Sequence, residues 1–138
     1  MRLPLIALFK LGRIEQAAAA FQGLLKTSDN WWTQANVATV LFAVGDDAAA
    51  IHMARKALVQ MSQTERVDPA SGVVALVLVA AESRVGRLDR AHAALIDFHA
   101  AVPTARNRAG IEAWRPSHAM LPDTPAFWEA LHRAGVGG

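Results

Sequence analysis

The sequence predicts an all-α domain built from antiparallel helix pairs, and three observations lead to this fold class. The chain of 138 residues is 53% hydrophobic, and 29 of its residues are alanine, the strongest helix former. Apolar residues recur with the i, i+3, i+4, i+7 spacing of one helix face. A turn signature, glycine followed five residues later by alanine, occurs three times. A single domain of this length buries about 68% of the surface of its unfolded chain, so one core is expected.

The repeated turn signature marks the junctions between paired helices. It spans Gly12–Ala17, Gly45–Ala50 and Gly86–Ala91. Each glycine follows one helical pattern and precedes another, so we expect it to take the left-handed conformation that ends a helix. The alanine begins the contact between the two helices, because a small side chain lets their axes approach. The glycines are 33 and then 41 residues apart, which indicates a longer loop near Ser62–Ser71.

The expected helices follow from these junctions. They cover residues 2–11, 14–27, 31–44, 47–62, 70–85 and 88–101. The second helix of each pair has an apolar stripe, made of Ala17, Ala20, Phe21 and Leu24, then Ala50, Ala54, Ala57, Leu58 and Met61, then Ala91, Ala94, Leu95 and Phe98. A strand is the alternative for Val73–Val79, which is short and β-branched, but the proline before it and Gly86 after it favour a helix.

Prolines divide the C-terminal part of the chain. Pro103 closes the third helix pair, residues 104–110 are expected to form a basic linker, and residues 111–114 a short apolar turn. Thr124 and Pro125 combine a helix cap with a proline at the first helical position, which predicts a helix over 124–134.

A single compact domain with two regions is therefore expected. Residues 1–103 would hold three helix pairs, the first of them truncated. Residues 104–138 would form a proline-rich linker and a C-terminal capping helix, which Gly135 would end.

These features resemble the tetratricopeptide repeat, a helix-turn-helix unit of 34 residues. The matching residues are Gly86, Ala91, Leu95 and Pro103, then Gly45, Ala50 and Ala57, then Gly12, Ala17 and Phe21. Ser62 and Asp29 stand where the family has its closing proline, and the first helices lack the usual aromatic residue and Leu-Gly pair. The resemblance covers residues 1–103 and implies a right-handed superhelical array.

The C-terminal segment carries a second resemblance. Phe127–Val136 is similar to the closing helix of bacterial signalling proteins in which a repeat array follows a nucleotide cyclase or a winged-helix domain. Neither of those domains is present in this sequence. The resemblance implies a detached or truncated C-terminal segment, or a small stand-alone relative, with a scaffold or regulatory role.

A concave face for a partner is the function that the resemblance implies. The first helices of such an array line a peptide-binding surface. The expected contact residues are Phe9, Lys10, Trp32, Asn36, Thr39, Phe42, Leu76 and Ser83. This surface is mostly apolar with a basic edge, so it could accept a partner helix or peptide. In the alternative interpretation, Phe9, Phe42 and Leu76 belong to the core, and the helix over residues 88–101 and the C-terminal helix cover the groove.

Self-association is a second hypothesis for the same class of protein. The apolar segment Met1–Phe9 lacks the polar cap that terminal repeats need, and a homodimer would bury it. Trp31 and Trp32 begin a helix side by side and cannot both point inward, so one of them is expected to face a groove or a neighbouring chain.

Catalytic, metal and cofactor sites are not expected. The chain has no cysteine, and it contains no nucleophile elbow, phosphate loop or zinc-protease motif. His92 and His99 lie seven residues apart, about 10 Å along a helix, too far to share one ion. An enzyme would need titratable groups such as Glu82, His92 and Asp97 to converge in a pocket.

Net charge and hydropathy indicate whether nucleic acid or a membrane is expected as a partner. The net charge of +2 is too close to zero to indicate a nucleic-acid-binding protein. Arg106, Arg108 and Arg115 near Trp114 offer a nucleic-acid alternative through stacking, but a linker whose tryptophan packs on the third helix pair is favoured. The longest apolar run, Val73–Ala81, is nine residues against the roughly 20 of a membrane span, so a cytoplasmic protein is expected.

Overall fold

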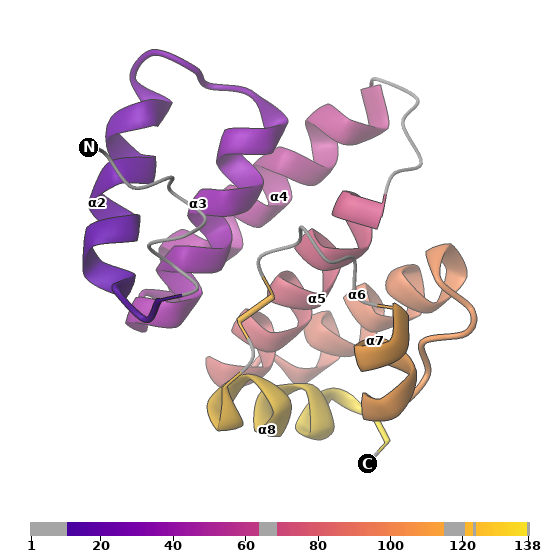
Figure 1. Ribbon diagram of the computed structural model, residues 1–138. Helices are drawn as coiled ribbons and strands as arrows, with labels where there is room; N and C mark the ends of the chain where they lie inside the picture. Colours follow the sequence, from indigo (N-terminus) through magenta and orange to yellow (C-terminus); the bar gives the residue numbers. More distant parts are fainter. Residues whose placement is uncertain (1–10, 64–68, 115–120, 123, 138) are drawn as a thin grey trace.

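The computed structural model describes residues 11–63, 69–114, 121–122 and 124–137 (Figure 1). Regular structure in these ranges is helical, apart from one isolated bridge between Asn107 and Gly137, so the all-α class is confirmed. The helices are α2 (Ile14–Leu25), α3 (Trp31–Val44), α4 (Asp47–Gln63), α5 (Pro69–Arg84), α6 (Leu88–Ala101), α7 (Arg108–Trp114) and α8 (Pro125–Ala134). The helix expected over residues 2–11 lies outside the described residues, except for Leu11 in a turn.

The predicted helix junctions are confirmed by the backbone. Left-handed φ angles of +80°, +93° and +85° occur at Gly12, Gly45 and Gly86. The alanines that follow them in the signature, Ala17, Ala50 and Ala91, are fully buried. At the second junction, the amide of Gly45 donates to the carbonyl of Phe42 (3.1 Å) and the amide of Asp46 to that of Leu41 (2.9 Å). These bonds satisfy the carbonyls at the end of α3.

Helix α5 forms the centre of the fold. It packs against α3, α4, α6 and α8, and each residue from Val73 to Ser83 is buried. A helix that is apolar on all sides needs neighbours on all sides, and α5 has them. The strand alternative for Val73–Val79 is therefore wrong, because that segment lies inside α5.

The linker after the third pair contains a helix that the sequence did not predict. We expected a linker over residues 104–110 and a turn over 111–114, but α7 begins at Arg108. The Asn107 side chain caps it by accepting a hydrogen bond from the amide of Gly110 (2.8 Å). Gly110 is needed there because a Cβ would lie 2.8 Å from the carbonyl oxygen of Thr104, so this glycine is a packing residue and not a helix breaker.

The last residue of α7 packs back onto the third helix pair. The ring of Trp114 lies edge-on to Phe98 of α6, with 5.4 Å between the ring centroids. A Cβ at Gly72 of α5 would lie 2.7 Å from Cζ2 of Trp114, so only glycine leaves room for the indole. The favoured expectation that Trp114 packs on this pair is confirmed.

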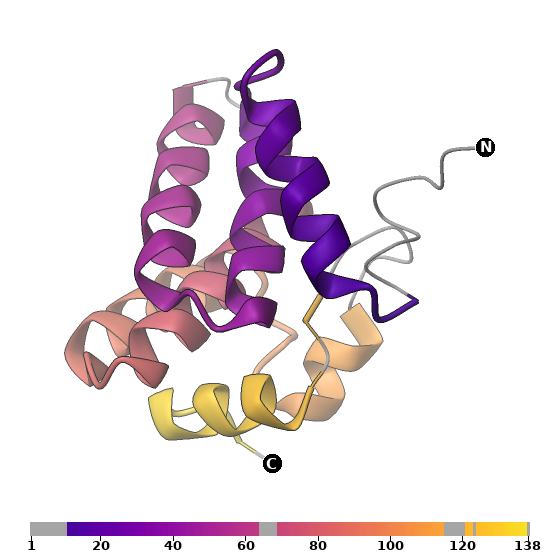
Figure 2. The same ribbon diagram turned by 90° about the vertical axis from the view of Figure 1, so that its left-hand side faces the viewer.

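Helix α8 starts and ends where the sequence predicted. The hydroxyl of Thr124 accepts a hydrogen bond from the amide of Phe127 (3.3 Å), Pro125 is the first residue, and Gly135 ends the helix with φ +119°. Figure 2 shows α8 running crosswise below the upright α2, α3 and α4, at the end opposite to the loop between α2 and α3. Among the described residues, no helix has the length and apolar character needed to span a bilayer.

Two glycines of opposite conformation give a test of this architecture. Gly23 lies in α2 with open space where a Cβ would be, so Gly23→Ala should raise the free energy of unfolding by about 0.5–1 kcal/mol. Gly45→Ala should lower it by about 1–2 kcal/mol, because Gly45 has φ +93°. Urea denaturation of both variants checks the prediction, and a shift of the same sign in both would contradict it.

Candidate functional site

The predicted contact residues divide into an exposed end and a buried part. Trp32 is 42% exposed at the start of α3, where its ring lies 6.2 Å from that of Phe21. Trp31 beside it is half-buried against the core, so the expectation that only one of the two tryptophans points inward is confirmed. Asn36, also half-buried, donates from its side chain to the carbonyl of Trp32 (2.9 Å). Phe9 and Lys10 lie outside the described residues.

The other four predicted residues are buried, which corrects the expectation of an open groove through them. They are Thr39, Phe42, Leu76 and Ser83. Thr39 donates its hydroxyl to the carbonyl of Ala35 within α3 (3.3 Å). The hydroxyl of Ser83 is buried without a hydrogen-bond partner among the described residues. The alternative interpretation, in which Phe42 and Leu76 are core residues, is confirmed for these two.

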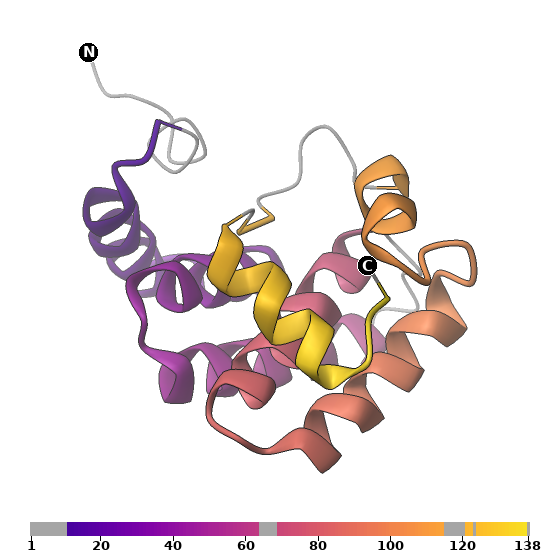
Figure 3. The ribbon, with the colours of Figure 1, turned by 90° about the horizontal axis from the view of Figure 1, so that it is seen from below.

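Helix α8 packs mainly on α5, with further contacts to α6 and, through Phe127, to Phe42 at the end of α3 (Figure 3). We call this surface the α8-binding face. Its buried side chains are Phe127, Trp128, Ala130, Leu131 and Ala134. Phe127 stands edge-on to Phe42 of α3, with ring centroids 5.9 Å apart and planes at 82°. The spacing of Phe127, Leu131 and Ala134 is i, i+4, i+7, the pattern with which an amphipathic helix fills an apolar groove.

Arg84 holds in place Phe42, a residue of α3 that α8 contacts. Its Nε donates to both carboxylate oxygens of Asp47 at 2.8 and 2.9 Å, and its Nη2 donates to Asp47 and to the carbonyl of Phe42 (2.6 Å). The guanidinium also stacks on the Phe42 ring, with Cζ 3.7 Å from the centroid. These contacts join the ends of α3 and α5 to the start of α4. Both charged side chains are largely withdrawn from solvent, which strengthens the pairing.

The titratable residues that an enzyme would need lie in different surroundings. Glu82 is fully buried, where its Oε1 accepts from Nη2 of Arg55 at 2.9 Å. Nδ1 of His92 lies 3.4 Å from the carbonyl oxygen of Ala134, at the end of α8. Asp97 is exposed on α6. Across the described ranges, no three histidine, aspartate or glutamate side chains are grouped to hold a metal ion.

The arginines after Pro103 are engaged separately. Nε of Arg106 donates to the carbonyl of Pro103 (3.1 Å), and Nε of Arg108 donates to Glu112 (3.0 Å). The guanidinium of Arg108 lies over the ring of Trp128, 4.6 Å from its centroid. Arg115 lies outside the described residues.

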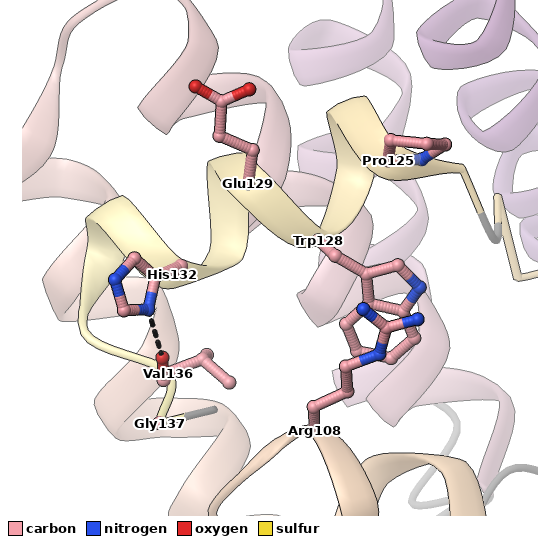
Figure 4. A pocket seen from close by; sticks show the side chains of 7 residues that line it. All are labelled: Arg108, Pro125, Trp128, Glu129, His132, Val136 and Gly137. Carbon is pink, nitrogen blue, oxygen red and sulfur yellow. Dashed lines mark hydrogen bonds between the residues drawn. The ribbon is translucent and has the colours of Figure 1, made fainter.

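The Arg108–Trp128 pair forms one wall of a pocket of about 350 Å³ beside α8 (Figure 4). The other lining residues are Pro125, Glu129, His132, Val136 and Gly137. Nδ1 of His132 lies 3.2 Å from the carbonyl oxygen of Val136, which holds the imidazole against the turn after α8. Sequence reasoning missed this pocket, because Arg108 and Trp128 are far apart in the chain.

His99 is the described histidine whose protonation the fold disfavours. Its Nε2 is buried without a hydrogen-bond partner among the described residues, and its ring lies 5.7 Å from that of Phe98. Burial lowers the pKa of His99 below its ordinary value of 6.5, and the charge of Arg106 lowers the pKa further. The folded protein therefore favours the neutral ring.

No family model, curated protein or solved structure matched the chain. The function is therefore argued from the contacts of its own residues.

Arg84→Lys should lower the free energy of unfolding by about 2 kcal/mol, because lysine cannot make the paired bonds to Asp47 or stack on Phe42. Arg133→Lys is the matched control. Its partner Glu129 is exposed on α8, so a change under about 0.5 kcal/mol is expected. Urea denaturation measures both, and equal effects would contradict the role given to Arg84.

A pH titration of stability tests the environment of His99. The pKa of the folded state lies below that of the unfolded chain, so this stabilisation is fully present above pH 6.5 and is lost as the pH falls through the lower value. Between pH 7.5 and 5, the free energy of unfolding should fall more steeply in the wild type than in His99→Gln. Parallel curves would show that His99 is not desolvated.

Proposed function

We propose that the chain is a tetratricopeptide-repeat-like segment that serves as a non-catalytic protein–protein interaction module. Its partner would be an amphipathic helix or peptide that binds the α8-binding face. Three features support the repeat assignment: the left-handed glycines, the buried alanines after them, and the consecutive packing of α2 to α6. The superhelical array, the bacterial signalling context and the cytoplasmic location belong to the same proposal.

The packing of α8 against the rest of the chain is the observation on which the proposal rests. The α8-binding face holds a helix whose buried residues Phe127, Leu131 and Ala134 are spaced i, i+4 and i+7, and Phe42 contacts the first of them. A face that binds one amphipathic helix in this manner has the shape and the apolar character to bind another of the same pattern. In this structure the occupant is the chain's own C-terminal helix.

An exposed tryptophan at the other end of α3 offers a further contact for a partner. Trp32 and Asn36 lie near the start of α3, at the end away from α8, and the ring of Trp32 lies 6.2 Å from that of Phe21 in α2. An exposed tryptophan provides a large apolar contact at low entropic cost, which is why this residue is frequent at binding hot spots. A longer partner would extend along α3 from Phe42 to reach Trp32.

Binding of the α8 sequence in trans tests the proposal. In the full chain, Phe127→Ala with Leu131→Ala removes the two side chains of α8 that are fully buried, each contributing about 2–5 kcal/mol of packing. A fluorescent peptide of residues 124–137 should then bind the variant in an anisotropy titration. It should not bind the wild type, whose face is filled.

Two controls make this result specific. The peptide carrying the same two alanines should not bind, because it lacks the anchors. The chain variant Glu129→Ala, changed on the exposed side of α8, should exclude the peptide as the wild type does. Circular dichroism establishes that the double variant is folded, and Leu131→Ala alone replaces it if it is not. A folded variant that ignores the peptide would overturn the proposal.

A further inference from the structure

A second hollow, of about 570 Å³, lies between α4 and α6 over α5. Its lining residues are Arg55, Leu78, Arg90, Ala93, Ala94 and Asp97, and we call it the α4–α6 groove. None of them belongs to the face that α8 covers through Phe42. The groove combines an apolar floor with three charged side chains, so it offers both contact area and electrostatic specificity.

The three charged side chains of the groove differ in whether they have an ion-pair partner. Arg55 is paired with the buried Glu82. Arg90 and Asp97 are exposed and, within the described ranges, have no hydrogen-bond or ion-pair partner. They are seven residues apart on one side of α6, too far to pair with each other directly. The groove therefore presents one free cation and one free anion at its two ends.

Small residues lie midway between these two charges. Ala93 and Ala94 occupy the i+3 and i+4 positions relative to Arg90, and Asp97 occupies i+7, so all four residues share one side of α6. Alanine lets a second helix approach closely. On the opposite wall, Val59 follows Arg55 by one turn of α4 and is 57% exposed, which extends the apolar surface.

We propose that a second copy of this chain docks on the α4–α6 groove, with the two α6 helices antiparallel across a twofold axis. Arg90 and Asp97 lie at equal distances along α6 from the midpoint between Ala93 and Ala94. An axis through this point places Arg90 of each copy opposite the partner's Asp97, and Ala93 opposite the partner's Ala94. Both free charges then gain a partner of opposite sign, and the small residues meet at the centre of the contact.

The order of the charges along α6 favours a second copy of the chain over a peptide as the occupant of the groove. A generic peptide would need its own acidic and basic residues at this spacing, whereas a second copy carries them by symmetry. This inference does not depend on the helix-binding function of the α8-binding face, and it differs from a dimer formed through Met1–Phe9, because it uses other residues. Each proposal can fail while the other holds.

Charge reversal in the full chain tests the dimer by sedimentation velocity over a concentration series. The wild type should dimerise with a Kd of about 10 μM or weaker, as expected for a small interface. Arg90→Asp leaves two acidic ends and should weaken self-association at least about 10-fold, as should Asp97→Arg, which leaves two basic ends. Mixed together, the two variants should associate with each other, because each acidic end then meets a basic one.

Two further variants separate this effect from general changes in charge or folding. The swap Arg90→Asp with Asp97→Arg restores opposite signs and should dimerise like the wild type. Arg87→Asp has the same charge change as Arg90→Asp, lies outside the groove and should still dimerise. A wild type that stays monomeric, an Arg90→Asp variant that dimerises normally, or single variants that do not associate when mixed would each overturn the proposal.

Discussion

The interaction on which the described fold depends is the contact of Arg84 with Asp47 and Phe42. At the end of α3, the carbonyl of Phe42 accepts one hydrogen bond from the amide of Gly45 (3.1 Å) and a second from the guanidinium of Arg84 in α5 (2.6 Å). The same group pairs with the first turn of α4 and covers one side of the Phe42 ring. This contact holds the Phe42 ring in place. Phe127 can then stand edge-on to the ring, which fixes the position of α8.

Local signals in the sequence predicted most of the helices, because the residues that start and stop a helix are its neighbours in the chain. Gly45 and Thr124 are examples, since each acts on backbone groups within a few residues. Helix α7 was missed because the contact that accounts for Gly110 cannot be recognised from its immediate neighbours in the chain. Gly110 looks like a breaker when only its neighbours are considered, while its tight contact with the Thr104 carbonyl is visible only in the fold.

Periodicity predicted which residues share a helix face, but it could not show what covers that face. Phe42 and Leu76 were placed on a concave surface, where an open groove and a filled one have the same sequence pattern. The contact between Arg108 and Trp128 also could not be predicted from the sequence. The two residues are far apart in the chain, and the fold brings them together.

The isolated bridge between Asn107 and Gly137 has a mechanical consequence. The amide of Arg108 donates to the carbonyl of Gly137 at 3.0 Å, so the end of α8 is tied to the start of α7. A pulling force applied beyond Gly137 would load this hydrogen bond and the Arg108–Trp128 stack before it could peel α8 from α5. The C-terminal end of α8 is therefore held by these two contacts in addition to its packing on α5.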